Sequence, residues 1–253
     1  MREGDARIKI AVRGLMTNSE DITSLHYGQA TTAMINALFA QGVTRATVLM
    51  RHSARFFDRN IHDLLNPLTE HGRTLSRQFG EDLTKDLVLR GYASPPERCV
   101  ETSELIIAAH ESQGGTGHRT RPIEGLGVFY VLDQQKMWKG LAQTDGLADY
   151  VSRWFNEQVP ADALMPAPLA VQMVLRVLQA RIEAPPLVAD KPQLDVCVTH
   201  DMTVYTVRHG VGLESAAGPD VEFLDGLVMY QQDGVWKMRS QHGGEVDLSA
   251  LLG

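Results

Sequence analysis

An apolar run that leads directly into a basic cluster is the feature that most constrains this chain. Residues 47–50 (TVLM) carry no charge, and Arg51, His52 and Arg55 follow at once. An uninterrupted run of this kind is typical of a strand buried on both faces of a parallel sheet. Open α/β sheets bind ligands at the carboxyl ends of such strands, and arginine forks match phosphate oxygens. The stretch therefore predicts either an anion site at a strand end or a solvent-exposed basic loop.

Length and charge limit the classes of partner. The 253 residues suffice for one large α/β domain, and the net charge of −7 argues against nucleic acid or an anionic membrane as the main partner. No apolar run approaches the roughly 20 residues of a membrane span. The first residues are too polar for a secretory signal, and Cys99 and Cys197 suit reduced thiols, so we expect a cytoplasmic protein.

Periodicity predicts alternating helices and strands along the chain. The expected elements are a helix over 27–41, a strand over 47–50, a helix from Thr69, a helix after the turn at 94–98, a helix over 169–182, a strand over 194–198, a helix ending at Gly210, and strands over 222–230 and 235–239. Residues 87–89 either extend the helix before them or begin a strand. Asp233-Gly234 is typical of a hairpin turn.

This order predicts one α/β domain over residues 1–253, a three-layer α/β/α sandwich with a mostly parallel sheet. Residues 1–45 form an N-terminal extension and helix, and the first 25 of them have no role that the sequence indicates. Residues 122–185 concentrate aromatic side chains and prolines, which predicts a mostly helical insertion that caps one end of the sheet.

Three turns share one arrangement, in which a strand ends and a group of polar side chains lies just before the next helix. They lie at 51–55 (RHSAR), 94–98 (SPPER) and 199–201 (THD). In a doubly wound sheet all three emerge at the carboxyl ends of the strands, where helix N-termini add partial positive charge. Three arginines and two histidines gathered there suit a doubly charged tetrahedral oxyanion.

These motifs resemble those of the histidine phosphatase superfamily, which includes phosphoglycerate mutase-like enzymes and histidine acid phosphatases. Residues 51–55 resemble its RHGxR signature, 68–72 (LTEHG) its L-T-x-x-G, and 94–102 (SPPERCVET) its S-P-x-x-R-x-x-x-T. Residues 198–201 (VTHD) complete the set. The four motifs come in the order of the family and span about residues 46–230, which makes the combination far more specific than any one of them.

The resemblance implies a phosphoglycerate mutase-like fold and a set of roles. His52 would be the nucleophile, Arg51, Arg55 and Arg98 would bind the phosphate, and His200 would complete the pocket. The chemistry agrees, because a neutral imidazole attacks phosphorus without a metal when fixed cations neutralise the phosphoryl charge. We therefore expect no metal and no cofactor, and a small phosphorylated substrate or a phosphoprotein as partner.

Two departures from the family pattern concern the site. Ser53 stands where the signature has glycine, and its hydroxyl is a candidate donor to the phosphate. The proton donor has two candidates. Asp201 follows His200 as in the acid phosphatase branch and is preferred, whereas Glu124 corresponds to the acid of the mutase-like branch.

Three other interpretations stand beside this one. A phosphomutase is disfavoured because residues 56–60 (FFDRN) replace the serine-tryptophan-asparagine type stretch of the mutases. A non-catalytic phosphate or phosphoprotein binder would lack a nucleophile or an acid, and both are present. Arg208-His209-Gly210 also spells RHG, but it is better interpreted as the end of a helix.

Overall fold

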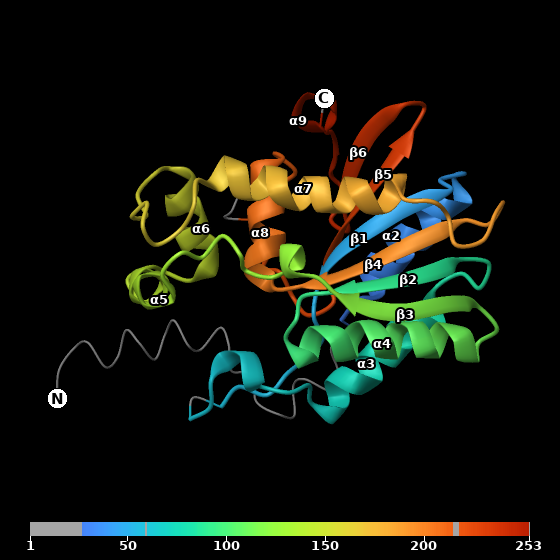
Figure 1. Ribbon diagram of the computed structural model, residues 1–253, viewed down its shortest axis with the longest axis horizontal. Helices are drawn as coiled ribbons and strands as arrows, with labels where there is room; N and C mark the ends of the chain where they lie inside the picture. Colours follow the sequence, from blue (N-terminus) through green and yellow to red (C-terminus); the bar gives the residue numbers. More distant parts are fainter. Residues whose placement is uncertain (1–26, 59, 215–217, 253) are drawn as a thin grey trace.

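A mixed seven-stranded sheet forms the centre of the computed structural model, which describes residues 27–58, 60–214 and 218–252 (Figure 1). Its order is β3-β2-β4-β1-β5-β6-β7. The strands are β1 (Arg45–Arg51), β2 (Val88–Ala93), β3 (Thr116–Pro122), β4 (Gln193–Thr199), β5 (Gly226–Gln232), β6 (Val235–Ser240) and β7 (Glu245–Asp247). The first four run parallel to one another and the last three pair antiparallel, so the expected parallel sheet is present with an antiparallel extension.

Helices cover both faces of this sheet. They are α2 (Gln29–Ala40), α3 (Glu70–Asp82), α4 (Glu97–Ser112), α5 (Gln134–Leu141), α6 (Leu147–Phe155), α7 (Ala167–Glu183), α8 (Asp201–Gly210) and α9 (Ser249–Leu252), with the 3-10 turns η2 (Asp63–Leu65) and η3 (Glu124–Leu126). In Figure 1, α7 and α8 lie on one side of the sheet and α3 and α4 on the other. The three-layer prediction is confirmed. Within the described residues, no helix has both the length and the apolarity to cross a bilayer.

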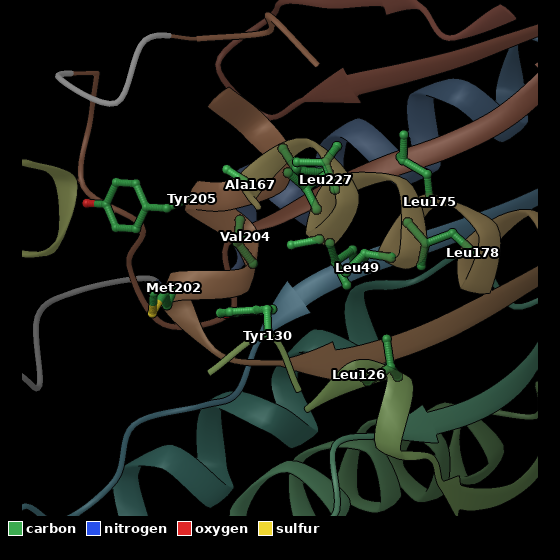
Figure 2. Close-up of a cluster of buried hydrophobic side chains, with 14 of the residues drawn as sticks. Leu49, Leu126, Tyr130, Ala167, Leu175, Leu178, Met202, Val204, Tyr205 and Leu227 are labelled. Atoms are coloured by element: carbon green, nitrogen blue, oxygen red, sulfur yellow. The ribbon is translucent and has the colours of Figure 1, made fainter. Parts of the chain in front are cut away.

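Strand β1 is buried on both faces, as its sequence predicts. Val48 and Met50 pack into the core on the side of α2, α3 and α4, whereas Leu49 packs into the core on the side of α7 and α8. Successive side chains of a strand point to opposite faces, so an unbroken apolar run serves both cores. Figure 2 shows Leu49 beside Leu175 and Leu178 of α7.

Two of the differences between the sequence prediction and the structure have identifiable reasons. Strand β3 was not expected, because it is a polar edge strand (TGHRTRP) that needs only one partner and no apolar face. Strand β5 begins at Gly226 rather than at 222, because the residues before it form a turn that contacts the site. Residues 88 and 89 open β2, and residues 87–89 do not extend α3. Residues 1–25, for which the sequence indicates no role, lie outside the described residues.

The segment 122–185, expected as a cap, divides into two parts. Its helix α7 lies along the sheet and packs against β1, β4 and β5, so it belongs to the three-layer core. Helices α5 and α6 lie beyond the carboxyl ends of the parallel strands, where α6 contacts α8 (Figure 1). Only this second part has the position of a cap.

The LTEHG motif is locked to the RHSAR turn by a close backbone contact. Thr69 caps α3 by accepting the Gly72 N–H at 2.9 Å, and its own N–H donates to the Ala54 carbonyl at 3.0 Å. A Cβ atom on Gly72 would lie 2.0 Å from the Ala54 oxygen. Only glycine permits this approach, so the N-terminus of α3 sets the position of the turn that follows β1.

We expect Gly72→Ala to lower the free energy of unfolding by about 1–3 kcal/mol, because the added methyl group forces two backbone segments apart. Urea denaturation measures this loss. Arg77→Ala, on the exposed face of the same helix, should change stability by less than about 0.5 kcal/mol. Equal effects of the two substitutions would show that the contact does not constrain the turn.

Candidate active site

The sheet register brings the three predicted turns together. Arg51 of β1 lies opposite Thr199 of β4, and Ala93 of β2 lies opposite Val198. The chain continues this alignment beyond the strands, since the His52 N–H donates to the Thr199 carbonyl at 3.0 Å. The turns 51–55, 94–98 and 199–201 therefore meet at one edge of the sheet, and the predicted convergence is confirmed.

His52 lies at the centre of this edge in a defined tautomer. Its side chain is buried, with 3% of its surface exposed. Nδ1 lies 2.8 Å from the Ser53 carbonyl oxygen, which can only accept, so Nδ1 carries the hydrogen. Nε2 then holds the lone pair, and it accepts a hydrogen bond from Arg98 Nε at 3.1 Å. The atom that would attack phosphorus faces an arginine.

The environment keeps His52 neutral. Burial lowers the pKa of its imidazole well below the usual value, and the neighbouring His200, Arg51 and Arg98 lower it further. A neutral imidazole at physiological pH is the form with a lone pair available for attack. The electrostatics of the site therefore favour the nucleophilic state.

Arg51 is held by groups that the sequence did not reveal. Its Nη1 donates to the Val221 carbonyl at 2.6 Å, its Nη2 lies 3.3 Å from Asp201 Oδ2, and its guanidinium stacks 4.1 Å from the centre of the Phe223 ring. The Tyr205 hydroxyl accepts the Val221 N–H at 3.1 Å and so fixes the backbone segment whose carbonyl binds Arg51. A backbone carbonyl leaves no signal in a sequence, so only the fold identifies it.

Arg55 and Arg98 share one carboxylate. Asp63 Oδ1 lies 2.8 Å from Arg55 Nη2, and Asp63 Oδ2 lies 3.3 Å from Arg98 Nη2. The Asp63 carbonyl also accepts from Arg98 Nη1 at 2.9 Å. Sequence reasoning missed Asp63, which lies in the turn η2 between two motifs and belongs to none of them.

His200 joins the site, but its ring nitrogens are engaged by protein groups. Nε2 lies 2.9 Å from Ser94 Oγ, and Nδ1 lies 3.4 Å from Arg98 Nη2. Burial and then the charge of Arg98 lower the pKa of His200 to about 4, so the ring is neutral near pH 7. Arg98 can only donate, so Nδ1 is the acceptor and the Nε2 hydrogen is directed to Ser94.

Asp201 is ionised beside Arg51. Burial raises the pKa of its carboxyl group, but the charge of Arg51 and the Met202 N–H bound to Oδ1 outweigh burial, and the pKa lies below the usual range. Its side chain remains 32% exposed. A carboxylate in this state accepts hydrogen bonds and has no proton to donate.

Glu124 lies at the same edge of the sheet on the turn η3. The Leu126 carbonyl of that turn accepts the Thr199 hydroxyl at 2.6 Å, which holds η3 against the end of β4. Among the described residues, the exposed Glu124 side chain has no hydrogen-bond or ion-pair partner. The structure thus places both acid candidates at the carboxyl ends of the strands, Asp201 with a cationic partner and Glu124 with none among the described residues.

Ser53 does not have the position of a phosphate ligand, which corrects the sequence prediction. Its hydroxyl donates to the Gly72 carbonyl at 2.7 Å, and its backbone N–H donates to Thr102 Oγ1 at 3.1 Å. The residue is fully buried. The serine that replaces the signature glycine ties the turn to α3 and has no donor left for an anion.

The other candidate groups have structural roles. Cys99 and Cys197 are free buried thiols, as predicted, and burial raises the pKa of Cys99 to about 12, so it stays protonated. Helix α8 ends at Gly210, which confirms that Arg208-His209-Gly210 is a helix end. Across the described parts of the chain, no group of three or more His, Cys, Asp or Glu side chains is placed to hold a metal ion.

The two buried histidines predict a stability change in mild acid. Their pKa values lie below the ordinary value of about 6.5, so the unfolded chain binds more protons as the pH falls. The free energy of unfolding should therefore fall between pH about 6.5 and about 4, by up to about 1.4 kcal/mol per pH unit for each histidine. Urea denaturation at a series of pH values measures this slope.

His200→Gln removes one of the two groups and should flatten that slope by about 1.4 kcal/mol per pH unit where it is steepest. The comparison is of slopes, so a constant loss of stability in the variant does not affect it. An unchanged slope would mean that His200 is not kept neutral by the fold.

Known structures share the fold of this chain. No family model and no curated protein matches the sequence. A phosphoglycerate mutase of Bacillus anthracis is 16% identical with a TM-score of 0.52, covering 79% of this chain and 94% of the mutase. A mycobacterial glucosyl-3-phosphoglycerate phosphatase, solved with inorganic phosphate, is 17% identical with a TM-score of 0.52, covering 78% and 95%. The chain therefore has the phosphoglycerate mutase-like fold that such mutases and phosphatases share.

Proposed function

We propose that the protein is a metal-independent phosphatase that hydrolyses a phosphomonoester through a phosphohistidine on His52. The observation that carries this proposal is the buried, neutral His52 ring, whose Nε2 lone pair faces a guanidinium. A core histidine needs no arginines around it, and an anion site needs no oriented imidazole. Their combination suits nucleophilic attack on a bound phosphoryl group.

The proposed reaction has two steps. Arg51, Arg55 and Arg98 hold the phosphoryl oxygens while His52 Nε2 attacks phosphorus, and the neutral His200 completes the pocket beside Arg98. The bond from phosphorus to the ester oxygen breaks, and an acid protonates the departing alkoxide. Water then attacks the phosphohistidine and gives one proton back to the acid that protonated the alkoxide. The bond from phosphorus to Nε2 breaks, which releases inorganic phosphate and restores the neutral imidazole. The Ser53 carbonyl keeps the Nδ1 hydrogen in place, so the attacking nitrogen does not change.

The comparisons support this reaction class at the level of the fold. The mycobacterial phosphatase and the Bacillus mutase named above both act on phosphorylated compounds by their printed names. For this chain, hydrolysis is the better proposal because residues 56–60 (FFDRN) replace the serine-tryptophan-asparagine type stretch of the mutases.

We expect His52→Ala to lower phosphomonoesterase activity by at least about 10³-fold, because the covalent step loses its nucleophile. A panel of aryl, sugar and amino-acid phosphates assayed with EDTA measures this, and EDTA should leave the wild-type rate unchanged. His118→Ala, an exposed histidine on β3, serves as the control and should retain full activity. Undiminished turnover by His52→Ala would contradict the mechanism, and loss of activity in EDTA would indicate a metal-dependent one.

Of the two acid candidates, Glu124 is the better candidate for the proton donor in the site without bound phosphate. Asp201 is held in its charged form by Arg51, which opposes protonation of this carboxylate. Glu124 is held at the same edge and has no cationic partner among the described residues. We therefore propose Glu124 as the proton donor and keep Asp201, the sequence-based preference, as the alternative.

The dependence on the leaving group separates the two acids. Glu124→Gln should lower the rate with an alkyl phosphate by about 10²–10⁴-fold and barely affect p-nitrophenyl phosphate, because that phenolate departs without a proton. Asp201→Asn should lower both rates to a similar extent, since Arg51 loses its ion-pair partner. Steady-state kinetics on both esters measure this, and the opposite pattern would identify Asp201 as the acid.

A further inference from the structure

Arg98 has almost no donor left for a ligand. Its Nε donates to His52 Nε2 at 3.1 Å, and its Nη1 donates to the Asp63 carbonyl at 2.9 Å. Its Nη2 lies 3.3 Å from Asp63 Oδ2 and 3.4 Å from His200 Nδ1. Four of the five N–H groups that a guanidinium offers are therefore engaged by the protein itself. A phosphate cannot bind this fork bidentately until Asp63 leaves it.

The Asp63 carboxylate is arranged as a bound anion would be. One oxygen lies 2.8 Å from Arg55 and the other 3.3 Å from Arg98, so it bridges two arginines with one oxygen on each. Arg98 is almost fully buried, whereas 26% of the Asp63 side chain is exposed. The carboxylate thus reaches the buried arginine from the solvent side, as a substrate would.

We infer that Asp63 is an internal anion that occupies the phosphate site of the free protein and is displaced when a phosphoryl group binds. The inference rests on the proposed function, because it takes the arginines as phosphate ligands. Charge supports it. Three arginines against Asp63 and Asp201 leave the site with one net positive charge, and release of Asp63 leaves two, which balances a phosphate dianion.

The surrounding structure lets this displacement occur at low cost. Asp63 lies in the turn η2, of which no residue is buried, so its movement uncovers no core. Leu64 and Leu65 beside it are already exposed. The carboxylate and the ligand then compete for the same donors, and the apparent affinity for phosphate is the intrinsic affinity multiplied by the fraction of molecules in which Asp63 has left.

Binding of inorganic phosphate measures this competition directly. We expect Asp63→Asn to bind phosphate at least about fivefold more tightly than wild type in titration calorimetry, because the partly exposed ion pairs no longer oppose the ligand. The asparagine keeps the backbone carbonyl that Arg98 contacts, so the turn retains one anchor. Thermal unfolding confirms that the variant is folded.

Asp58→Asn is the matched control. It removes the same charge from the same segment, but the Asp58 carboxylate binds Asn60 and no described arginine. A general electrostatic effect would strengthen phosphate binding equally in both variants and would overturn the inference. Weaker binding by Asp63→Asn would also overturn it, by showing that Asp63 orients the arginines for the ligand.

The same titration distinguishes this inference from the proposed function. Tighter binding by Asp63→Asn than by Asp58→Asn, with no hydrolysis of any phosphomonoester, would support the internal anion and contradict the phosphatase. Absence of phosphate binding in wild type and in both variants would overturn the inference together with the anion site. Hydrolysis that depends on His52, with equal affinities in the two aspartate variants, would overturn the inference alone.

Discussion

This site depends on the protein acceptors that bind its three clustered guanidinium groups and balance their positive charge. Arg51, Arg55 and Arg98 repel one another where water is scarce, so each needs an acceptor from the protein. Asp201 and the Val221 carbonyl compensate the first, and Asp63 compensates the other two. These contacts determine which groups titrate, which donors are free and what a ligand has to replace.

That compensation also explains the state of the histidines. Positive charge and burial act in the same direction on an imidazole, and both lower its pKa. His52 is therefore neutral, and the Ser53 carbonyl selects its tautomer. His200, between Ser94 and Arg98, is neutral for the same reasons. In the free protein the proposed nucleophile, His52, is neutral, but Arg98 donates to its Nε2. Asp63 and His200 accept from the other engaged donors of Arg98.

The sheet provides the rigid part of this arrangement. Parallel pairing of β1 with β4 sets His52 beside His200, and the contact between Gly72 and Ala54 sets the turn that carries the arginines. Asp63 lies to one side of the site, in the turn η2, which has no buried residue. The displacement of Asp63 that we infer would therefore leave His52 in place.

The sequence by itself determined the features of the fold that depend on the pattern of neighbouring residues. The run at 47–50 predicted a strand buried on both faces, Thr69 predicted a helix start, and the motif order predicted which turns converge. These predictions hold because apolar alternation, capping and strand ends are properties of neighbouring residues.

Only the tertiary structure decided which partner each polar group takes. It assigned the Ser53 hydroxyl to the Gly72 carbonyl instead of an anion, paired Asp201 with Arg51, and brought Asp63 and the Val221 carbonyl into the site. Hydrogen bonds and ion pairs form between groups that lie within about 3–4 Å of each other, whatever their separation in the chain. No local pattern records such a distance, so the sequence predicted which turns meet but not the electrostatic state of the side chains on them.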